Sequence, residues 1–154
     1  MSVESNKRTV NRMPLEAFNE GRLEVVDEVM SDDMVDHSMQ PGLPPGREGV
    51  KALITAVRSA FPDLKNTVIR QIAEGDIVVQ QIHSSGTMTG DYMGMKATGK
   101  SATWEAVHIA RVKDGKIVEH WSVQDQLGML QQLGLAPAPP AAKGAQSGES
   151  SSME

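Results

Sequence analysis

Cysteine is absent from this chain of 154 residues, and so are several other features that define common protein classes. Without cysteine, the protein has no disulfide bond, no thiolate nucleophile and no cysteine-ligated zinc. Lysine and arginine do not cluster, and the net charge is −5, which argues against a nucleic-acid partner. The longest apolar run is far shorter than the roughly 20 residues that cross a bilayer, and the first residues lack the hydrophobic segment of a signal peptide. We therefore expect a cytoplasmic protein that binds neither nucleic acid nor membranes.

Motifs of the common cofactor-dependent and nucleophilic enzymes are missing as well. The chain has no phosphate-binding loop, no glycine pattern for dinucleotides, no nucleophile elbow and no H-E-x-x-H motif. Asp36 and His37 resemble a metal-ligand pair, but adjacent strand residues face opposite sides, so we expect no metal there. What remains is a set of carboxylates and four histidines. These groups are suited to general acid–base catalysis in a pocket without a cofactor.

The first half of the chain has the pattern of helices. The helical period predicts a helix over residues 5–19, which Pro14 should distort, and a second helix around residues 23–30. A short extended piece and a Pro/Gly loop then lead to a third helix over residues 46–61, which Pro62 ends. With 39% hydrophobic residues, a chain of this length suits one domain.

The second half has the pattern of strands. Residues 64–74 and 76–87 form a predicted hairpin, and the glycine-rich residues 86–100 should be an exposed, mobile loop that could close as a lid. A second hairpin starts near residue 103 and runs into a short helix at about Gln126–Leu133. The fold class is therefore α+β: a curved antiparallel sheet packed on three N-terminal helices as a cone-shaped barrel with an apolar mouth. Residues 1–135 form this domain, and residues 136–154 should be a disordered Pro/Ala/Ser-rich tail.

The second hairpin gathers the groups most suited to a site, and its register decides which of them meet. If Asp114 and Gly115 form a two-residue type I′ turn, one face carries the following four residues: Trp104, His108, Trp121 and Asp125. Asp125 and His108 would then lie about 13 Å apart along the ladder and act on different atoms of a ligand. In a competing three-residue loop, His108 would face His120 and Asp125 would move to the other face. We prefer the first register, with His120 on the face away from the site.

Asp125 and His108 are accordingly the predicted catalytic residues. Asp125 would remove a proton next to a carbonyl group and His108 would stabilise or protonate the enolate. A second interpretation of Asp125 is that it only caps the helix that follows it. The predicted substrate-binding residues are Trp104, Trp121, His37, His83, Phe61, Met88 and Tyr92, several of which could instead be ordinary core residues.

Several segments resemble one known family. They are AFPDL at 60–64, GTMTGDYMGMKATGK at 86–100, RVKDGKIVEHWSVQDQLGMLQQLG at 111–134 and the DHS that follows the second helix. Over residues 6–135 the chain resembles the SnoaL-like polyketide cyclases, or ester cyclases, of the nuclear-transport-factor-2-like superfamily. The resemblance implies a cone-shaped α+β fold and ring closure by intramolecular aldol condensation on an aromatic polyketide methyl ester, without a cofactor.

The resemblance also implies roles for particular residues. The acid/base aspartate of the family falls on Asp125 and its pocket histidine on His108, whereas Met88 and Ala97 stand where many relatives have histidine and proline. An apolar or aromatic small molecule is the expected substrate of this cyclase or lyase. Alternatives are a non-catalytic binding protein, or a hydratase, dehydratase or isomerase with the same pocket. Because an open sheet exposes its outer face, we also expect a homodimer.

Overall fold

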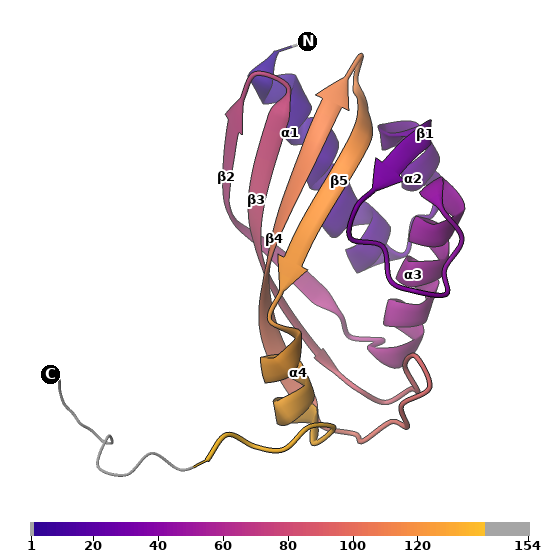
Figure 1. Cartoon of the computed structure of the whole chain (residues 1–154), viewed down its shortest axis with the longest axis vertical. Coiled ribbons are helices and arrows are strands. Elements are labelled where there is room, and N and C mark those ends of the chain that lie inside the picture. The colour runs from indigo at the N-terminus through magenta and orange to yellow at the C-terminus, as the bar shows by residue number, and fades with distance from the viewer. Residues whose placement is uncertain (1, 141–154) are drawn as a thin grey trace, which may run out of the picture.

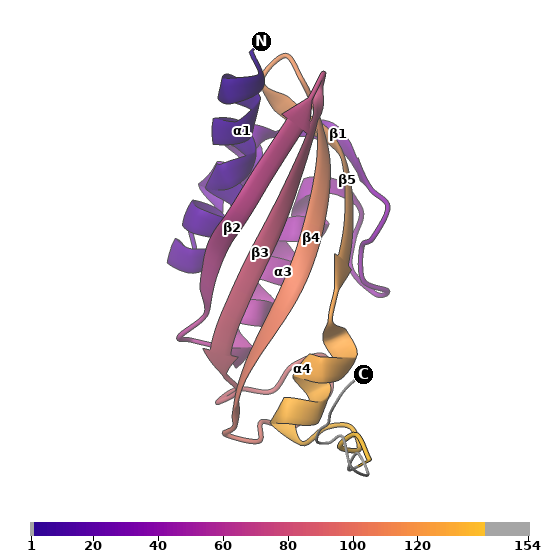
Figure 2. The same ribbon diagram turned by 90° about the vertical axis from the view of Figure 1, so that its left-hand side faces the viewer.

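The computed structural model describes residues 2–140. Figures 1 and 2 show a curved sheet with helices on its concave side and one short helix across its lower end. The helices are α1 (Val3–Arg12), the π-helix η1 (Met13–Phe18), α2 (Glu24–Val29), α3 (Gly46–Ala60) and α4 (Gln126–Leu133). The strands are β1 (Met30–Asp36), β2 (Lys65–Glu74), β3 (Ile77–Thr87), β4 (Ser101–Lys113) and β5 (Lys116–Gln124). The predicted α+β cone is thus confirmed.

Proline distorts the first helix, as predicted. The N-cap of α1 is Ser2, whose side chain accepts a hydrogen bond from the Ser5 amide in a capping box. Pro14 has no N–H with which to continue the α-helical ladder, and the chain widens into the π-helix η1.

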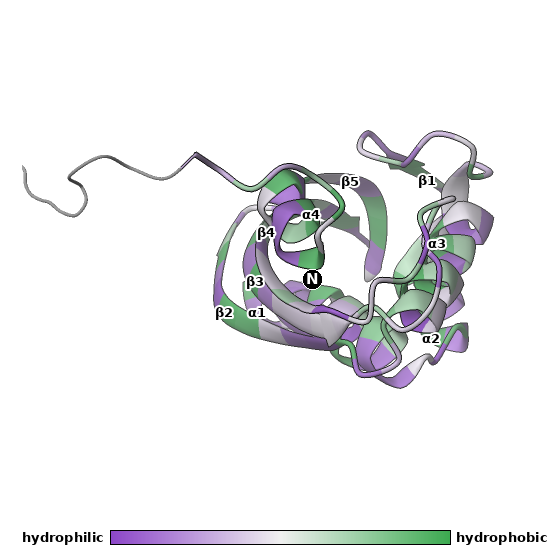
Figure 3. Cartoon of the chain, turned by 90° about the horizontal axis from the view of Figure 1, so that it is seen from below, coloured by the Kyte–Doolittle hydropathy of each residue, from purple (hydrophilic) through white to green (hydrophobic). Residues whose placement is uncertain are grey.

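The five strands lie in the order β1-β5-β4-β3-β2. The strands from β2 to β5 are antiparallel neighbours, but β1 pairs with β5 in parallel. The expectation of a wholly antiparallel sheet is therefore wrong at this edge: the extended piece after α2 joins the sheet and makes it mixed and open. Viewed along the cone, the sheet wraps from β2 round to β5, and α2 and α3 lie across from it (Figure 3).

The β4–β5 hairpin begins in the predicted register and then departs from it. Asp114 and Gly115 have φ angles of 51° and 77°, as a type I′ turn requires, and Lys113 pairs with Lys116. Between Arg111 and Val112 the register shifts by one residue of β5, so that Arg111 pairs with Glu119. A β-bulge of this kind moves every later side chain of the strand to the other face.

The bulge has a physical reason in the residues around it. It lets Ile117 remain in the core, at 2% exposure, while the next charged residue, Glu119, turns outward. There Glu119 accepts a hydrogen bond of 2.9 Å from Nε of Arg111. Without the bulge the carboxylate of Glu119 would face the apolar interior, where an unpaired charge is costly.

The loop that precedes β4 is partly buried rather than exposed. The amides of Thr89 and Gly90 donate to the carbonyl of Ala60 at the end of α3, and Met88 and Tyr92 lie in the core. The prediction of an exposed loop therefore holds only for its second half. Residues 141–154, most of the predicted tail, lie outside the described residues, and no helix within 2–140 is long and apolar enough to span a membrane.

Candidate active site

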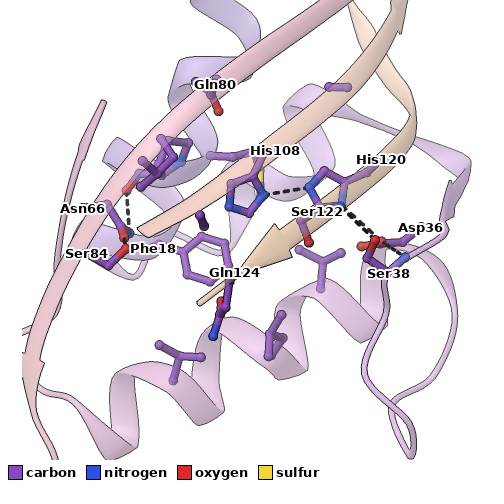
Figure 4. A pocket seen from close by; sticks show the side chains of 18 of the residues that line it. Phe18, Asp36, Ser38, Asn66, Gln80, Ser84, His108, His120, Ser122 and Gln124 are labelled. Carbon is purple, nitrogen blue, oxygen red and sulfur yellow. Dashed lines mark hydrogen bonds and ion pairs between the residues drawn. The ribbon is translucent and has the colours of Figure 1, made fainter. Parts of the chain in front are cut away.

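A cavity of about 190 Å³ lies inside the cone, between the sheet and the helices. Its apolar wall comes from helices and sheet alike, with Met13, Phe18, Val50, Leu53, Trp104 and Met129 among its members. Its polar members include two groups: Asp36, His108 and His120 from β1, β4 and β5, and Asn66, Gln80 and Ser84 from β2 and β3 (Figure 4). A mostly apolar hollow with a few converging polar groups is the usual form of a small-molecule site.

The first polar group is a chain of three side chains from three neighbouring strands. Nδ1 of His108, on β4, lies 2.9 Å from Nε2 of His120, on β5. Nδ1 of His120 in turn lies 3.1 Å from Oδ1 of Asp36, at the end of β1. The bulge in β5 is what turns His120 inward, and the parallel pairing of Asp36 with His120 brings the carboxylate beside it.

The carboxylate at the end of this chain is ionised. Burial alone would raise the pKa of Asp36, but its contact with His120 and a hydrogen bond of 2.9 Å from the Ser38 amide outweigh burial, and the pKa lies below its ordinary value. A further hydrogen bond, from the His37 amide to the His120 carbonyl, fixes the backbone of this turn against β5. Asp36 is therefore a half-buried, ionised carboxylate that is held against Nδ1 of His120.

The imidazole of His108 is neutral. Burial, aided by the nearby His120, lowers the pKa of His108 to about 4. A carboxylate only accepts hydrogen bonds, so Nδ1 of His120 carries a proton toward Asp36. Nε2 of His120 then accepts from Nδ1 of His108, and this direction of the hydrogen bond leaves the lone pair of His108 on its Nε2. That nitrogen has no hydrogen-bond partner within residues 2–140, and Figure 4 shows it on the side of the cavity near Phe18 and Gln124.

Three of the residues predicted for the site do line the cavity: His108, Trp104 and Tyr92. Burial raises the pKa of Tyr92, whose hydroxyl accepts a hydrogen bond of 3.3 Å from Gln40. Phe61 and Met88 lie one layer further out and do not line it. Phe61 packs on Trp104 with ring centres 5.4 Å apart, and Met88 is fully buried.

Three other predicted residues, Trp121, His37 and His83, do not line this cavity. The shift in register turns Trp121 to the outer side, where it stacks on His37 with ring centres 4.8 Å apart. His37 follows Asp36 and so points the opposite way, toward Glu119 at 3.0 Å. His83 also faces outward from β3 and pairs with Glu105.

Asp125 does not line the cavity either, so the predicted face shared by Trp104, His108, Trp121 and Asp125 is wrong. Asp125 is exposed and lies just past the end of β5, where its Oδ1 accepts a hydrogen bond of 3.0 Å from the Gly128 amide. This is the helix-capping position that was the second interpretation of this residue.

The important residues missed from the sequence are Asp36 and His120, together with the second polar group. One usable signal was the inner face of β3, where Gln80 and Ser84 interrupt the apolar residues Val78 and Ile82. A polar residue on the buried face of a strand needs a partner or a ligand. No comparable signal marked Asp36, because its partner depends on the parallel pairing of β1 with β5.

An α+β cone with an apolar cavity lined by a pair of hydrogen-bonded imidazoles defines a small-molecule protein equipped for acid–base chemistry. The family profile described as SnoaL-like polyketide cyclase matches residues 8–133, and the chain belongs to this family. The family predicted from the sequence is therefore confirmed.

Relatives of known function agree with this assignment. The chain is 32% identical over 120 residues to a nogalonic acid methyl ester cyclase of Streptomyces nogalater, covering 77% of this chain and 90% of that protein. It is 31% identical over 128 residues to the aklanonic acid methyl ester cyclase DnrD of Streptomyces peucetius, covering 81% and 88%. The structure of TsrD from Streptomyces laurentii superposes with a TM-score of 0.81 at 27% identity, covering 88% and 99%. The predicted function as a polyketide (ester) cyclase is thus confirmed.

Proposed function

We propose that the cavity closes a ring in a polyketide methyl ester by an intramolecular aldol reaction, with His108 as the base. The observation that carries this proposal is the unpartnered Nε2 of His108 beside the cavity, at the end of the chain from Asp36 through His120. The methyl ester cyclases among the relatives support the substrate class, since both act on esters of polyketide acids.

The reaction needs one base that returns the proton it takes. Nε2 of His108 removes a proton from the carbon next to the ester or ketone carbonyl, and the electron pair of that C–H bond becomes an enolate. The enolate carbon then forms a bond to the carbon of a second ketone in the same molecule. That ketone oxygen becomes an alkoxide and takes the proton back from Nε2, so no proton is gained or lost overall.

The low pKa of His108 is compatible with this role. Enolisation in other enzymes is performed by bases whose pKa values lie only a little above 4. When Nε2 takes up the substrate proton, the positive charge can be shared along the hydrogen bond with His120 and is stabilised by the Asp36 carboxylate. Asp36 and His120 are therefore positioning residues that hold the reactive tautomer of His108.

The size and polarity of the cavity fit the reacting part of such a substrate. At about 190 Å³ it is smaller than the roughly 300 Å³ at which pockets begin to enclose whole drug-sized ligands. We infer that the cavity takes the ring and side chains that react, and that the remaining fused rings extend toward solvent. Trp104 and Phe18 supply flat apolar surface for this contact. A cytoplasmic location and a homodimer are further parts of the proposal.

The test is ring closure of aklanonic acid methyl ester by purified variants, followed by chromatography of the product. His108→Gln should lower turnover at least 10²-fold, because a general base contributes about 10² to 10⁴ to the rate. His83→Gln is the matched control, since His83 lies on the outer face of β3. Wild-type turnover in the His108 variant would contradict the proposal, as would an equal loss in the His83 variant.

A further inference from the structure

We propose that Gln80 is a specificity-determining residue whose side-chain oxygen accepts a hydrogen bond from a hydroxyl group of the substrate. The inference rests on the proposed function for the nature of the ligand, a hydroxylated aromatic polyketide. Its physical basis is independent of the proposed base, because Gln80 belongs to the second polar group of the cavity and takes part in no proton transfer.

Gln80 is held by a chain of side-chain amides that reaches back to the backbone of α1. Nε2 of Gln80 donates to Oδ1 of Asn11 at 2.8 Å. Nδ2 of Asn11 donates to Oε1 of Gln71 at 3.2 Å, and Nε2 of Gln71 donates to the carbonyl of Lys7 at 3.1 Å. Gln80 itself is only 2% exposed, so the chain orders a side chain in the interior of the cone.

The Lys7 carbonyl, at the end of this chain, fixes the direction of every hydrogen bond in it. The carbonyl oxygen of Lys7 can only accept, so Gln71 must present its NH₂ group there and its oxygen to Asn11. Asn11 must then present its NH₂ group to Gln71 and its oxygen to Gln80. It follows that Gln80 directs its own NH₂ group toward Asn11, which leaves Oε1 for the cavity.

The free oxygen lies beside the proposed base. Gln80 pairs directly with His108 across the β3–β4 ladder, so their side chains stand next to each other on the inner face. Figure 4 shows the oxygen of Gln80 on the side of His108. Within residues 2–140, Oε1 makes no hydrogen bond with the protein, although the side chain lines the cavity.

A buried acceptor of fixed orientation selects for a donor. A phenolic or enolic hydroxyl near the reacting carbon satisfies Oε1, whereas a methoxy group or a ketone at the same place brings two acceptors together and leaves Oε1 desolvated. Sites built to bind a hydroxyl group reject analogues without it far more strongly than apolar pockets reject a change of one methyl group. The chain from Lys7 to Gln80 thus selects the hydroxylation pattern of the substrate.

The experiment measures binding without turnover, by calorimetric titration with 1-naphthol and 1-methoxynaphthalene as probes. The quantity of interest is the ratio of their dissociation constants. Gln80→Met, which keeps the length of the side chain without its acceptor, should reduce the preference for the naphthol at least about tenfold relative to wild type. Asn11→Leu, which frees Gln80 to rotate, should reduce it in the same direction and by a smaller factor.

Two control variants test whether the preference for the naphthol comes from Gln80 or from another residue. Gln81→Met changes the same residue type on the opposite face of β3 and should keep the wild-type ratio. His108→Phe tests whether the naphthol binds the imidazole instead. A preference that survives both Gln80→Met and Asn11→Leu but is lost in His108→Phe would overturn the inference and leave the role of His108 as base intact. Loss of the preference in Gln80→Met, together with full ring closure by His108→Gln, would overturn only the assigned base.

Discussion

A single side chain, Asp125, shows how two roles for one residue are separated by its surroundings. A carboxylate can act as a base, which accepts a proton, or as a helix cap, which accepts a hydrogen bond. In the structure Asp125 is exposed and accepts a hydrogen bond of 3.0 Å from the Gly128 amide, whereas Asp36 is half-buried next to an imidazole. All three of Asp36, His120 and His108 line the cavity, and in the proposed function Asp36 acts through His120 on His108.

We therefore expect Asp125→Asn to keep the turnover number for ring closure within about threefold of the wild-type value. Asparagine caps helices about as well as aspartate, so the free energy of unfolding should hardly change. Asp125→Ala, which removes the cap, should lower it by about 1 kcal/mol. Turnover assays and denaturant unfolding of both variants check this prediction. If Asp125→Asn instead lost turnover about 10²-fold with unchanged stability, Asp125 would be restored as the base.

Asp36→Asn has a different expected outcome. An amide at this position can present its NH₂ group to Nδ1 of His120, which favours the tautomer with the proton on Nε2 and leaves Nδ1 of His108 as the acceptor. Nε2 of His108 then carries the proton and cannot act as a base. We expect turnover to fall at least tenfold with little change in KM, measured by steady-state kinetics. Asp32→Asn, an exposed residue of the same strand, is the control and should behave as wild type.

At the scale of elements, one β-bulge decides which residues make up the site. The turn at Asp114 and Gly115 is a local feature with a sequence signature, so it was predicted correctly. The bulge near Val118 has no such signature, because it results from the placement of Ile117 in the core and of Glu119 beside Arg111. Only the packed structure contains those partners, which is why the shared face was predicted wrongly.

The boundaries of the other elements were predictable because they depend on local chemistry. Pro14 and Pro62 interrupt helices, and the Gly75 turn joins β2 and β3. The role of β1 was harder to predict, because α3 and the strands β2, β3 and β4 separate it from β5 in sequence. Its pairing with β5 brings Asp36 to His120, so the proposed chain from Asp36 through His120 to His108 depends on a long-range contact.

The loop between β3 and β4 gives a prediction at this scale. An added Cβ on Gly90 would overlap the backbone oxygen of Ser59, so Gly90→Ala must push the loop away from α3. We expect the free energy of unfolding to fall by about 1–3 kcal/mol, the usual cost of overpacking. Because the loop carries Tyr92 to the cavity, KM should also rise. Thermal unfolding and steady-state kinetics test both effects, and an unchanged melting temperature would contradict the contact.

At the scale of the whole molecule, the buried His108 couples stability to pH. Its pKa is about 4 in the folded protein against 6.5 ordinarily, so between these values the unfolded chain binds a proton that the folded chain does not. Stability should therefore rise from pH 4 to 6.5, with His108 contributing up to about 3 kcal/mol of that rise. In His108→Gln this part of the rise should be missing, as urea unfolding at several pH values would show. An equal rise of the free energy of unfolding with pH in wild type and in His108→Gln would contradict the low pKa of His108.

The outer face of the sheet gives the second prediction for the whole molecule. Val107 and Val123 pair on this face and are 41% and 77% exposed, next to Trp121. We expect this apolar surface to be covered in a homodimer. Light scattering after size exclusion should find a dimer for wild type and a monomer for the Val107→Lys, Val123→Lys double variant. Leu127→Lys, a change at an exposed apolar residue of α4, should leave the dimer intact.

The central claim is that Nε2 of His108 removes the proton from carbon, and isotope exchange tests it most directly. The probe is an ester analogue of the substrate without the second ketone, so that enolisation occurs but ring closure cannot. In D₂O, proton NMR should show wild type and Asp125→Asn exchanging the proton next to the carbonyl at similar rates, and His108→Gln exchanging it at least 10²-fold more slowly. Exchange that persists in His108→Gln and is lost in Asp125→Asn would contradict the account.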